Sequence, residues 1–368
     1  MALRKRALNN CVSLLYSRFS VRIILSCVLS SKGRLTMAEN EGFSSANTCR
    51  TVYQSSQYSS SVLLEAVKEI IPPLLETAHK GEAGRIGVIG GSQEYTGAPY
   101  FAAISALKTG ADLVHVFCTA DSATVIKSYS PELIVHPLLD RKHAVNEISE
   151  WLPRLHSLVI GPGMGRNPNN IDNAKSVIEK AIKLGKQIII DADGLHIVTS
   201  YPDLIKNYTK IILTPNVVEF ARLYYAVMGE SLDPNGDSQT QVEDLSKALG
   251  HVTICRKGQT DIISDGHQVV FGSTPGSSRR CGGQGDLLSG SMGTFVYWAY
   301  NWSEKNKGEE NCSPLSPTII AAYAASSLTR TCNSLAFAKM RRSMTTSDMI
   351  AEIQVAFEKL FGSKENNE

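Results

Sequence analysis

A glycine-rich stretch that contains one carboxylate is the part of this sequence best suited to chemistry. Residues 276–290 read GSSRRCGGQGDLLSG, and an apolar pattern of helical spacing follows Asp286. Glycines let backbone N–H groups converge on one anion, and the free N–H groups at a helix start attract the same charge. Arg279 and Arg280 would add charged donors. The stretch therefore predicts a phosphate site, with Asp286 as a general base or as a simple helix cap.

Two further motifs could act on the same phosphates. Asn216 and Glu219 are three residues apart at the start of a predicted helix, where their oxygens could hold Mg²⁺ through water. The same pair could instead form a capping box. Lys257 follows a predicted strand and offers a point charge to a polyphosphate, or is only a solvated side chain.

Two familiar nucleotide signatures are missing from the sequence. It contains no G-x-x-x-x-G-K-[ST] phosphate loop and no G-x-G-x-x-G after the first predicted strand. These absences argue against a Walker-type NTPase and against an ordinary Rossmann dehydrogenase.

The elements that must position these motifs alternate between strands and helices. Apolar runs between residues 61 and 362 predict one α/β domain, in which helices cover both faces of a mostly parallel central sheet. An Asp265-Gly266 turn predicts an antiparallel hairpin at one edge of that sheet. The expected strands are 85–89, 113–117, 133–137, 157–160, 187–191, 210–213, 252–256, 261–264 and 268–271. The expected helices are 99–109, 145–155, 170–184, 217–228, 242–249, 287–300, 317–332 and 347–360, with a polar surface loop at 303–313.

The beginning of the chain has a composition of its own. Residues 1–38 contain seven Lys or Arg and no Asp or Glu, among many Ser and Leu, which is typical of an organellar transit peptide. We expect a transit peptide at 1–36, addressed to a chloroplast or a mitochondrion, a flexible linker at 37–60 and a short tail at 363–368. Initiation at Met37 would give a cytosolic form.

Composition limits the partners of the remaining chain. It holds 30 basic and 35 acidic residues, which argues against a nucleic-acid partner. No apolar stretch approaches the roughly 18 residues of a transmembrane helix, so we expect no membrane partner. The eight cysteines include no C-x-x-C pair, which predicts reduced thiols. Composition leaves open whether the chain forms a homo-oligomer.

Several motifs in one order resemble a known family. Asn-x-x-Glu after one strand, Lys-Gly after the next and Gly-x-Gly-Asp at a helix start resemble the ribokinase-like superfamily, which has a three-layer α/β/α fold. Other motifs narrow the resemblance to the ATP-dependent NAD(P)H-hydrate dehydratase family over about residues 60–360. These motifs are Gly90–Pro99, Gly161–Arg166, Asp191–Leu195, Thr214–Arg222 and Cys281–Asp286.

The resemblance implies an activity and a set of contacts. The family uses ATP and Mg²⁺ to remove water from the S epimer of hydrated NADH or NADPH, so ATP would be the co-substrate and the hydrated dinucleotide the substrate. By carry-over, Asp286 would be the base at the substrate ring, and Asn216 and Glu219 would organise Mg²⁺. The substrate contacts would be Gly165, Asn216, Val217, Val218, Glu219, Phe220, Ala221, Arg222 and Asp286. The ATP contacts would be Lys257, Gly258, Gln259, Thr260, Asp261, Gly276, Ser277, Ser278, Arg279, Arg280, Cys281, Gly282, Gly283, Gln284 and Gly285.

Other functions share these residues. A hydroxymethylpyrimidine or hydroxyethylthiazole kinase of the same superfamily would also use Asp286 and the glycine-rich stretch, but it would release a stable phosphate ester. A catalytically silent nucleotide-binding regulator would need an impaired site, and no motif is lost here. The region before residue 60 is too short for the epimerase domain that some relatives carry. We therefore expect the epimerase partner to be a separate chain.

Overall fold

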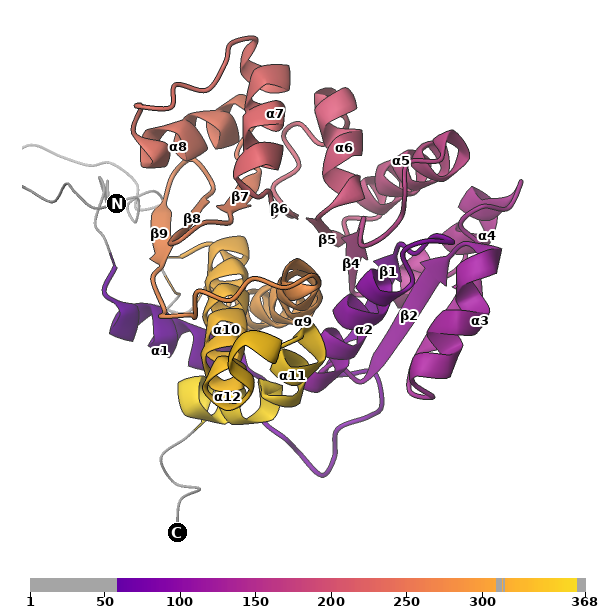
Figure 1. The fold of residues 1–368 in the computed structure, drawn as a ribbon, viewed down its shortest axis with the longest axis horizontal. Coiled ribbons are helices and arrows are strands. Elements are labelled where there is room, and N and C mark those ends of the chain that lie inside the picture. The colour runs from indigo at the N-terminus through magenta and orange to yellow at the C-terminus, as the bar shows by residue number, and fades with distance from the viewer. Residues whose placement is uncertain (1–57, 309–312, 314, 363–368) are drawn as a thin grey trace, which may run out of the picture. The chain divides into compact units, whose positions relative to one another are not determined.

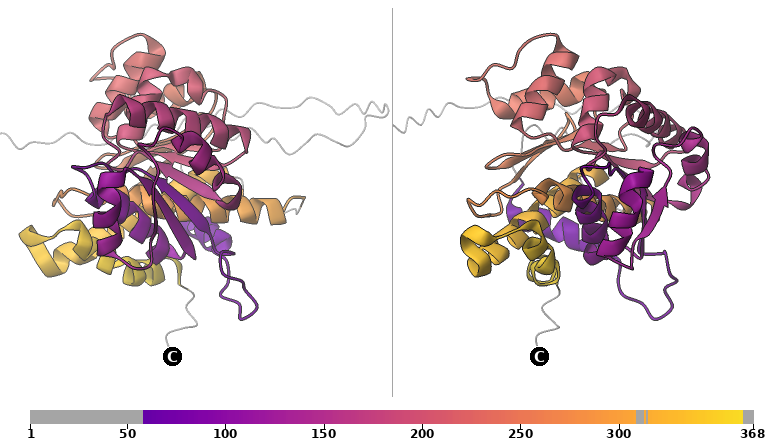
Figure 2. Two further views of the ribbon diagram at one scale, coloured as in Figure 1. Left: turned by 90° about the vertical axis from the view of Figure 1, so that its right-hand side faces the viewer. Right: turned by 45° about the vertical axis from the view of Figure 1, so that its right-hand side comes forward.

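The computed structural model describes residues 58–308, 313 and 315–362 of the chain. The expected transit peptide, the Met37 start, most of the linker and the tail lie outside these residues. Within them, the expected three-layer α/β/α arrangement is present (Figure 1). Figure 2 shows the same layering from two other sides, with helices above and below the sheet.

A nine-stranded sheet organises the described part of the chain. Its strand order is β3-β2-β1-β4-β5-β6-β7-β8-β9. Pairing is parallel from β3 through β7 and antiparallel between β7, β8 and β9, which form the expected edge hairpin. From β1 the chain adds β2 and β3 on one side and then crosses to add β4 and the later strands on the other side. Ligands of open parallel sheets bind beyond the carboxyl ends of the strands, near the point where the strand order reverses. The strands are β1 Arg85–Ile89, β2 Leu113–Cys118, β3 Ile134–Pro137, β4 Ser157–Ile160, β5 Gln187–Ile190, β6 Ile211–Leu213, β7 Thr253–Arg256, β8 Asp261–Ser264 and β9 Val269–Gly272.

Helices cover both faces of the sheet. One face carries α1 Ser60–Ile70, α2 Gly97–Thr109, α3 Ala120–Tyr129, α9 Gln284–Lys305, α10 Pro317–Met340, α11 Thr346–Ala351 and α12 Ile353–Phe361. The other face carries α4 Ala144–Ser149, α5 Pro168–Lys183, α6 Asp193–Ser200, α7 Val217–Met228 and α8 Ser238–Ala248. Short 3₁₀ turns occupy Leu152–Arg154, Pro202–Leu204 and Arg341–Ser343.

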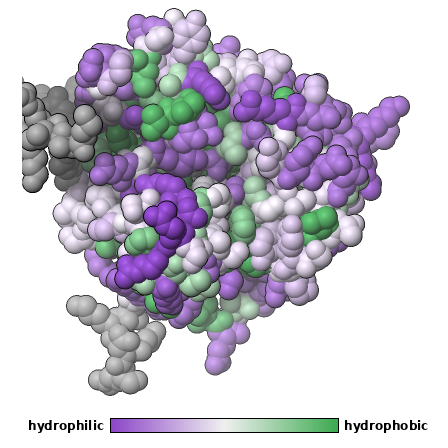
Figure 3. All heavy atoms as spheres, in the orientation of Figure 1, coloured by the Kyte–Doolittle hydropathy of each residue, from purple (hydrophilic) through white to green (hydrophobic). Residues whose placement is uncertain are grey.

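The two helical layers enclose separate apolar cores. Successive residues of a strand point to opposite faces, so Leu158 of β4 lies in one core and Val159 in the other. All four residues of β4 are buried, which is typical of a parallel strand covered on both sides. On the face shown in Figure 3, apolar residues form small separate patches among polar ones. Among the described helices, none combines the length and the hydropathy that crossing a membrane requires.

The structure departs from the sequence-based expectation at several helices. Helices α1, α3 and α6 were not predicted. The helix expected at 145–155 ends at Ser149 and is followed by a 3₁₀ turn that contains Pro153, which has no N–H to continue an α-helix. The helix expected at 347–360 is two helices, α11 and α12. Helix α9 runs to Lys305 because Trp302 still packs against the core, so the polar loop begins later than residue 303.

Candidate active site

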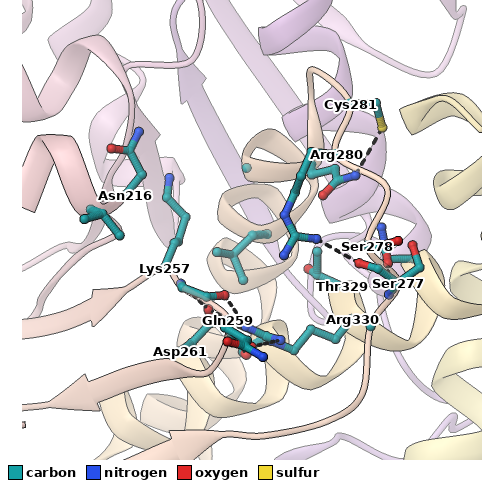
Figure 4. A pocket seen from close by; sticks show the side chains of 18 of the residues that line it. Asn216, Lys257, Gln259, Asp261, Ser277, Ser278, Arg280, Cys281, Thr329 and Arg330 are labelled. Atoms are coloured by element: carbon teal, nitrogen blue, oxygen red, sulfur yellow. Dashed lines mark hydrogen bonds and ion pairs between the residues drawn. The ribbon is translucent and has the colours of Figure 1, made fainter. Parts of the chain in front are cut away.

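A pocket of about 1150 Å³ lies beside the N-terminus of α9, and we call it the α9 pocket. Figure 4 shows Asn216 and Lys257 on one side of it and Ser277, Ser278 and Arg280 on the other. Most of the expected ATP contacts and three of the expected substrate contacts line this pocket. The lining residues are Asn216, Val217, Val218, Lys257, Gly258, Gln259, Asp261, Gly276, Ser277, Ser278, Arg280, Cys281, Gln284, Gly285, Leu288, Ser326, Thr329, Arg330 and Asn333. Thr260, Arg279, Gly282 and Gly283 belong to the same loops but are not among the lining residues.

The turn that leads into α9 requires glycine at position 283. Gly283 is the N-cap of α9 and has φ of 94°. A Cβ atom there would lie 2.8 Å from the Phe101 ring and 2.9 Å from Thr346 Oγ1. Thr346 Oγ1 also donates a hydrogen bond to the Gly282 carbonyl at 2.6 Å, which fixes the turn. None of the described side chains caps this helix start, so its first N–H groups are available to an anion.

Asp286 does not serve as the helix cap, which excludes the simpler of its two interpretations. It lies in the first turn of α9, after the N-cap, and no hydrogen bond to its carboxylate is found among the described residues. Burial, and then the charge of nearby Asp191, raise the pKa of Asp286 well above its usual range, although Lys257 acts in the opposite direction. A partly buried carboxyl group with a raised pKa and no hydrogen-bond partner among the described residues is suited to accept a proton from a bound hydroxyl group.

A buried ion pair lies next to Asp286. Lys257 Nζ donates a hydrogen bond to Asp191 Oδ1 at 2.8 Å and lies 4.0 Å from Glu219 Oε2. The Asp191 side chain is only 2% exposed. Burial alone would lower the pKa of Lys257, but Asp191 and Glu219 outweigh that effect and raise it. Lys257 is therefore charged, and it brings positive charge to the pocket wall.

Asp191 is held at the end of β5 by strained and tightly packed backbone. The next residue, Ala192, has φ of 47° and ψ of −120°, a backbone conformation that residues other than glycine seldom adopt. At the end of the neighbouring strand β4, a Cβ on Gly161 would lie 1.9 Å from the Asp191 carbonyl oxygen. Only glycine permits this approach. The sequence analysis placed Asp191 at the end of an expected strand, but no local pattern linked this residue to Lys257.

Asn216 and Glu219 form the capping box that the sequence offered as one alternative. Asn216 Oδ1 accepts hydrogen bonds from the N–H groups of Val218 at 3.0 Å and Glu219 at 2.9 Å. Glu219 Oε2 accepts one from the Asn216 N–H at 2.8 Å. The capping box begins α7, and the first residues of this helix line the α9 pocket. The amide oxygen of Asn216 thus accepts two hydrogen bonds, whereas Oε1 of Glu219 accepts none from the part of the chain that the structure describes.

The remaining expected substrate contacts differ in their exposure to solvent. The Gly165 N–H donates to Asp193 Oδ2 at 2.9 Å, which holds the turn after β4 against the start of α6. Arg222 is exposed on α7. The side chain of Phe220 is fully buried in the core beside Tyr224, with the Arg256 guanidinium over its ring, so it has no surface to offer a ligand. The side chain of Phe220 therefore packs in the core, and the substrate contacts expected at Phe220 and Ala221 stay predictions.

Helix α10 supplies pocket residues that the sequence analysis missed. Ser326, Thr329, Arg330 and Asn333 line the α9 pocket, and their spacing places them on one helical face. Most other residues in the middle of this helix are apolar and buried. A polar stripe on an otherwise apolar helix is the signal that could have revealed them.

The described residues contain no ready-made metal centre. No group of three or more His, Cys, Asp or Glu side chains within residues 58–308 and 315–362 is arranged to hold a metal ion. Of the described cysteines, Cys118, Cys255, Cys281 and Cys332 are unpaired, and Cys281 alone of these lines the α9 pocket. Any cation in this pocket would need oxygen ligands from a bound molecule as well as from the protein.

Comparison with known sequences assigns the family. The family model for NAD(P)H-hydrate dehydratase matches residues 86–355 of the chain. The chain belongs to this family. It is 60% identical over 351 residues to the ATP-dependent (S)-NAD(P)H-hydrate dehydratase of Nematostella vectensis, a match that covers 94% of this chain and 95% of that protein. The protein of the same name from Homo sapiens is 57% identical over 298 residues, 81% of this chain and 84% of its own length.

Solved structures confirm the ribokinase-like fold. A ribokinase-like superfamily protein from Enterococcus faecalis superposes with a TM-score of 0.64 at 20% identity, covering 83% of this chain and 97% of that one. The ADP/ATP-dependent NAD(P)H-hydrate dehydratase from Bacillus subtilis, co-crystallized with ATP/Mg²⁺, superposes with a TM-score of 0.61 at 18% identity. This match covers 81% of this chain and 97% of that one. These identities are low, so the likeness concerns the fold.

Proposed function

We propose that this chain uses ATP to dehydrate the S epimer of hydrated NADH and NADPH, and so restores the reduced dinucleotides. The family assignment and the relatives that share this activity in their names support the proposal. The observation that carries it is Asp286, a partly buried carboxyl group in the first turn of α9 that has no hydrogen-bond partner among the described residues. Such a group can deprotonate a substrate hydroxyl beside a bound phosphate.

The reaction begins with phosphoryl transfer. Asp286 accepts the proton of the ring hydroxyl while that oxygen attacks the γ-phosphate of ATP, and ADP leaves. The free N–H groups at the start of α9 and the charge of Lys257 stabilise the negative charge on the transferring group. The phosphate then leaves the ring with the help of the nitrogen lone pair, and the neighbouring carbon loses a proton. The products are NADH or NADPH, ADP and inorganic phosphate.

The α9 pocket fits ATP on the grounds of its volume and its donors. Its walls are the β7–β8 loop, residues 257–260, and the β9–α9 loop, residues 273–283. Lys257 and Arg280 bring positive charge from opposite sides (Figure 4). Asp286 lies one residue beyond the lining residue Gly285, so the expected substrate position borders the expected ATP position.

Magnesium would be held mainly by Glu219. The amide oxygen of Asn216 already accepts two backbone hydrogen bonds, which leaves its NH₂ group to donate to water or phosphate. Oε2 of Glu219 accepts the Asn216 N–H and lies 4.0 Å from Lys257 Nζ, whereas Oε1 accepts no hydrogen bond from the described residues. Mg²⁺ usually takes one or two carboxylates and completes its shell with phosphate oxygens and water, so this donor set fits the ion. The ion would neutralise charge on the polyphosphate.

We further propose the cellular context. The enzyme acts on one epimer, so a separate epimerase must supply it from the other. The N-terminal leader would direct the chain to an organelle, and a start at Met37 would leave a cytosolic form.

The deciding experiment follows absorbance at the reduced-nicotinamide band. The protein is added with ATP and Mg²⁺ to a mixture of hydrated NADH epimers. We expect a rise that requires ATP and stops when the S epimer is consumed, with one phosphate released per molecule restored. No rise, together with a stable phosphate ester formed on a hydroxymethylpyrimidine or hydroxyethylthiazole alcohol, would establish the kinase function instead.

A further inference from the structure

Helix α10 joins both walls of the α9 pocket. Ser326, Thr329, Arg330 and Asn333 face the pocket from successive turns of this helix. Arg330 bonds to the β7–β8 loop and Asn333 bonds to the β9–α9 loop, although the two loops are separated in sequence by two strands. One rigid helix thus sets the distance between them.

Arg330 uses nearly all of its hydrogen-bonding capacity on the β7–β8 loop and the strand that follows it. Its Nε and Nη2 donate to the two carboxylate oxygens of Asp261 at 3.0 and 2.7 Å. Nη1 donates to the Gln259 carbonyl at 2.8 Å, and Nη2 also donates to the Gly258 carbonyl at 2.9 Å. These bonds engage four of the five guanidinium N–H groups. Figure 4 shows Arg330 reaching toward Asp261 and Gln259.

Asp261 is in turn fixed from several directions. Its Oδ1 accepts the Gly258 N–H at 2.9 Å, which closes the loop on itself. Its Oδ2 accepts the Ser326 hydroxyl of α10 at 2.7 Å. The Asp261 side chain is 8% exposed and that of Arg330 is 15% exposed. Charged hydrogen bonds with so little access to water are stronger than those on the surface.

Asn333 fixes the β9–α9 loop through hydrogen bonds to its backbone. Its Oδ1 accepts the N–H of Ser277, and its Nδ2 donates to the Arg279 carbonyl at 3.3 Å. Asn333 is 4% exposed, so these bonds are shielded from water. They hold the two ends of the Ser277–Arg279 segment, whose first two residues line the pocket.

We infer that Arg330 and Asn333 are positioning residues for the nucleotide, which fix the two ATP-binding loops at the separation that ATP requires. This inference rests on the proposed function of the α9 pocket. Neither residue needs to touch the reacting atoms. Their loss should therefore weaken ATP binding selectively, and it should leave the recognition of the hydrated dinucleotide almost unchanged.

The experiment compares Arg330→Lys, Arg330→Met and Asn333→Ala with Lys339→Met. Lys339 lies on the same helix, pairs with Glu352 and does not line the pocket, so it is a matched control. For Arg330→Lys and Asn333→Ala we expect KM for ATP and Kd for ATP to rise about tenfold, a change of about 1.4 kcal/mol. The KM for the hydrated dinucleotide should stay within about twofold and Lys339→Met should match the unmodified protein in both constants.

Arg330→Met tests the same inference with the charge removed. Lysine keeps the charge but cannot form the two-pronged contact, so Arg330→Lys should rescue little of the loss caused by Arg330→Met. Melting temperatures are measured for every variant, so that one that fails to fold is recognised. If the Arg330 variants fail to fold, the binding constants of Asn333→Ala test the inference. Equal changes in both KM values, or no change in Kd for ATP, would overturn the inference. A failure of the unmodified protein to bind ATP would instead overturn the proposed function.

Discussion

At the scale of single residues, Asp286 combines a proposed chemical role with a cost to stability. Its pKa is raised in the folded protein, so the folded state favours the protonated carboxyl more than the unfolded chain does. The stability that this preference contributes is complete below the ordinary pKa and is lost as pH rises through the raised value. The ionised form of Asp286 is therefore less favourable to the fold than the protonated form.

Asp286→Asn should separate these two properties. We expect kcat to fall by about 10²- to 10⁴-fold, because the amide cannot accept the proton. The melting temperature should rise at pH 7 to 8 and approach that of the unmodified protein near pH 4. Steady-state kinetics and thermal unfolding across this pH range measure both effects, and Kd for ATP is the control. An unchanged kcat would remove Asp286 from the role of base, and a lower melting temperature at every pH would contradict the electrostatic argument.

Lys257 and Asp191 make a second test at the same scale. Lys257→Met leaves the Asp191 carboxylate buried without its partner, which should cost about 3–5 kcal/mol in the free energy of unfolding. ATP binding should weaken as well, because the point charge is lost. Adding Asp191→Asn should restore most of the stability but none of the ATP affinity. Urea unfolding and ATP titration of the single and double variants distinguish the two roles, and a double variant that regains ATP binding would show that Lys257 does not contact the nucleotide.

At the scale of elements, the start of α7 combines a structural role with a proposed chemical one. Glu219→Gln keeps the capping box, because an amide oxygen can still accept the Asn216 N–H, but it removes the charge. We expect an unchanged melting temperature and a several-fold higher Mg²⁺ concentration for half-maximal activity. Asn216→Ala is the complementary variant and should lose about 1 kcal/mol of stability through the missing cap. If Glu219→Gln left the Mg²⁺ requirement unchanged, Glu219 would be a cap alone.

The elements that the sequence predicted well are those with strong local signals. The nine strands were located to within a residue or two at their ends, because buried β-branched runs between turn residues are distinctive. Helix α3 was missed because only Ser122, Ala123 and Ile126 of its ten residues are buried, and small residues give a weak apolar pattern. Helix α1 was missed for a different reason, since it adjoins a polar segment that we treated as a linker.

The sequence analysis named lining residues of the α9 pocket where one loop carries the signal, and it missed those that distant segments contribute. Residues of the glycine-rich stretch and Lys257 line the same pocket, and their assignment as phosphate contacts stays a prediction. Asp191 and Arg330 could not be assigned, because their partners are 66 and 69 residues away in sequence and only the folded sheet brings them together. The resemblance to a family supplied the dehydration chemistry, which the residue types alone do not specify.

At the scale of the whole molecule, the domain depends on α1 at its N-terminal side. Leu63, Val67 and Ile70 of α1 are buried in the core that α9 and α10 also form. The expected transit peptide and most of the linker precede this helix. Activity and stability should therefore be insensitive to removal of residues before Met37, but sensitive to changes within α1.

Two point variants and one shortened chain test this boundary. Leu63→Ala should lower the free energy of unfolding by about 2–5 kcal/mol, because Leu63 is 3% exposed and its loss leaves a cavity. Val62→Ala, at the neighbouring position that is 50% exposed, should change it by less than about 0.5 kcal/mol. A chain that begins at Met37 should unfold at the same urea concentration as the full chain and keep the same kcat. If the shortened chain were as unstable as Leu63→Ala, residues before Met37 would belong to the folded domain, and their assignment as a removable leader would be wrong.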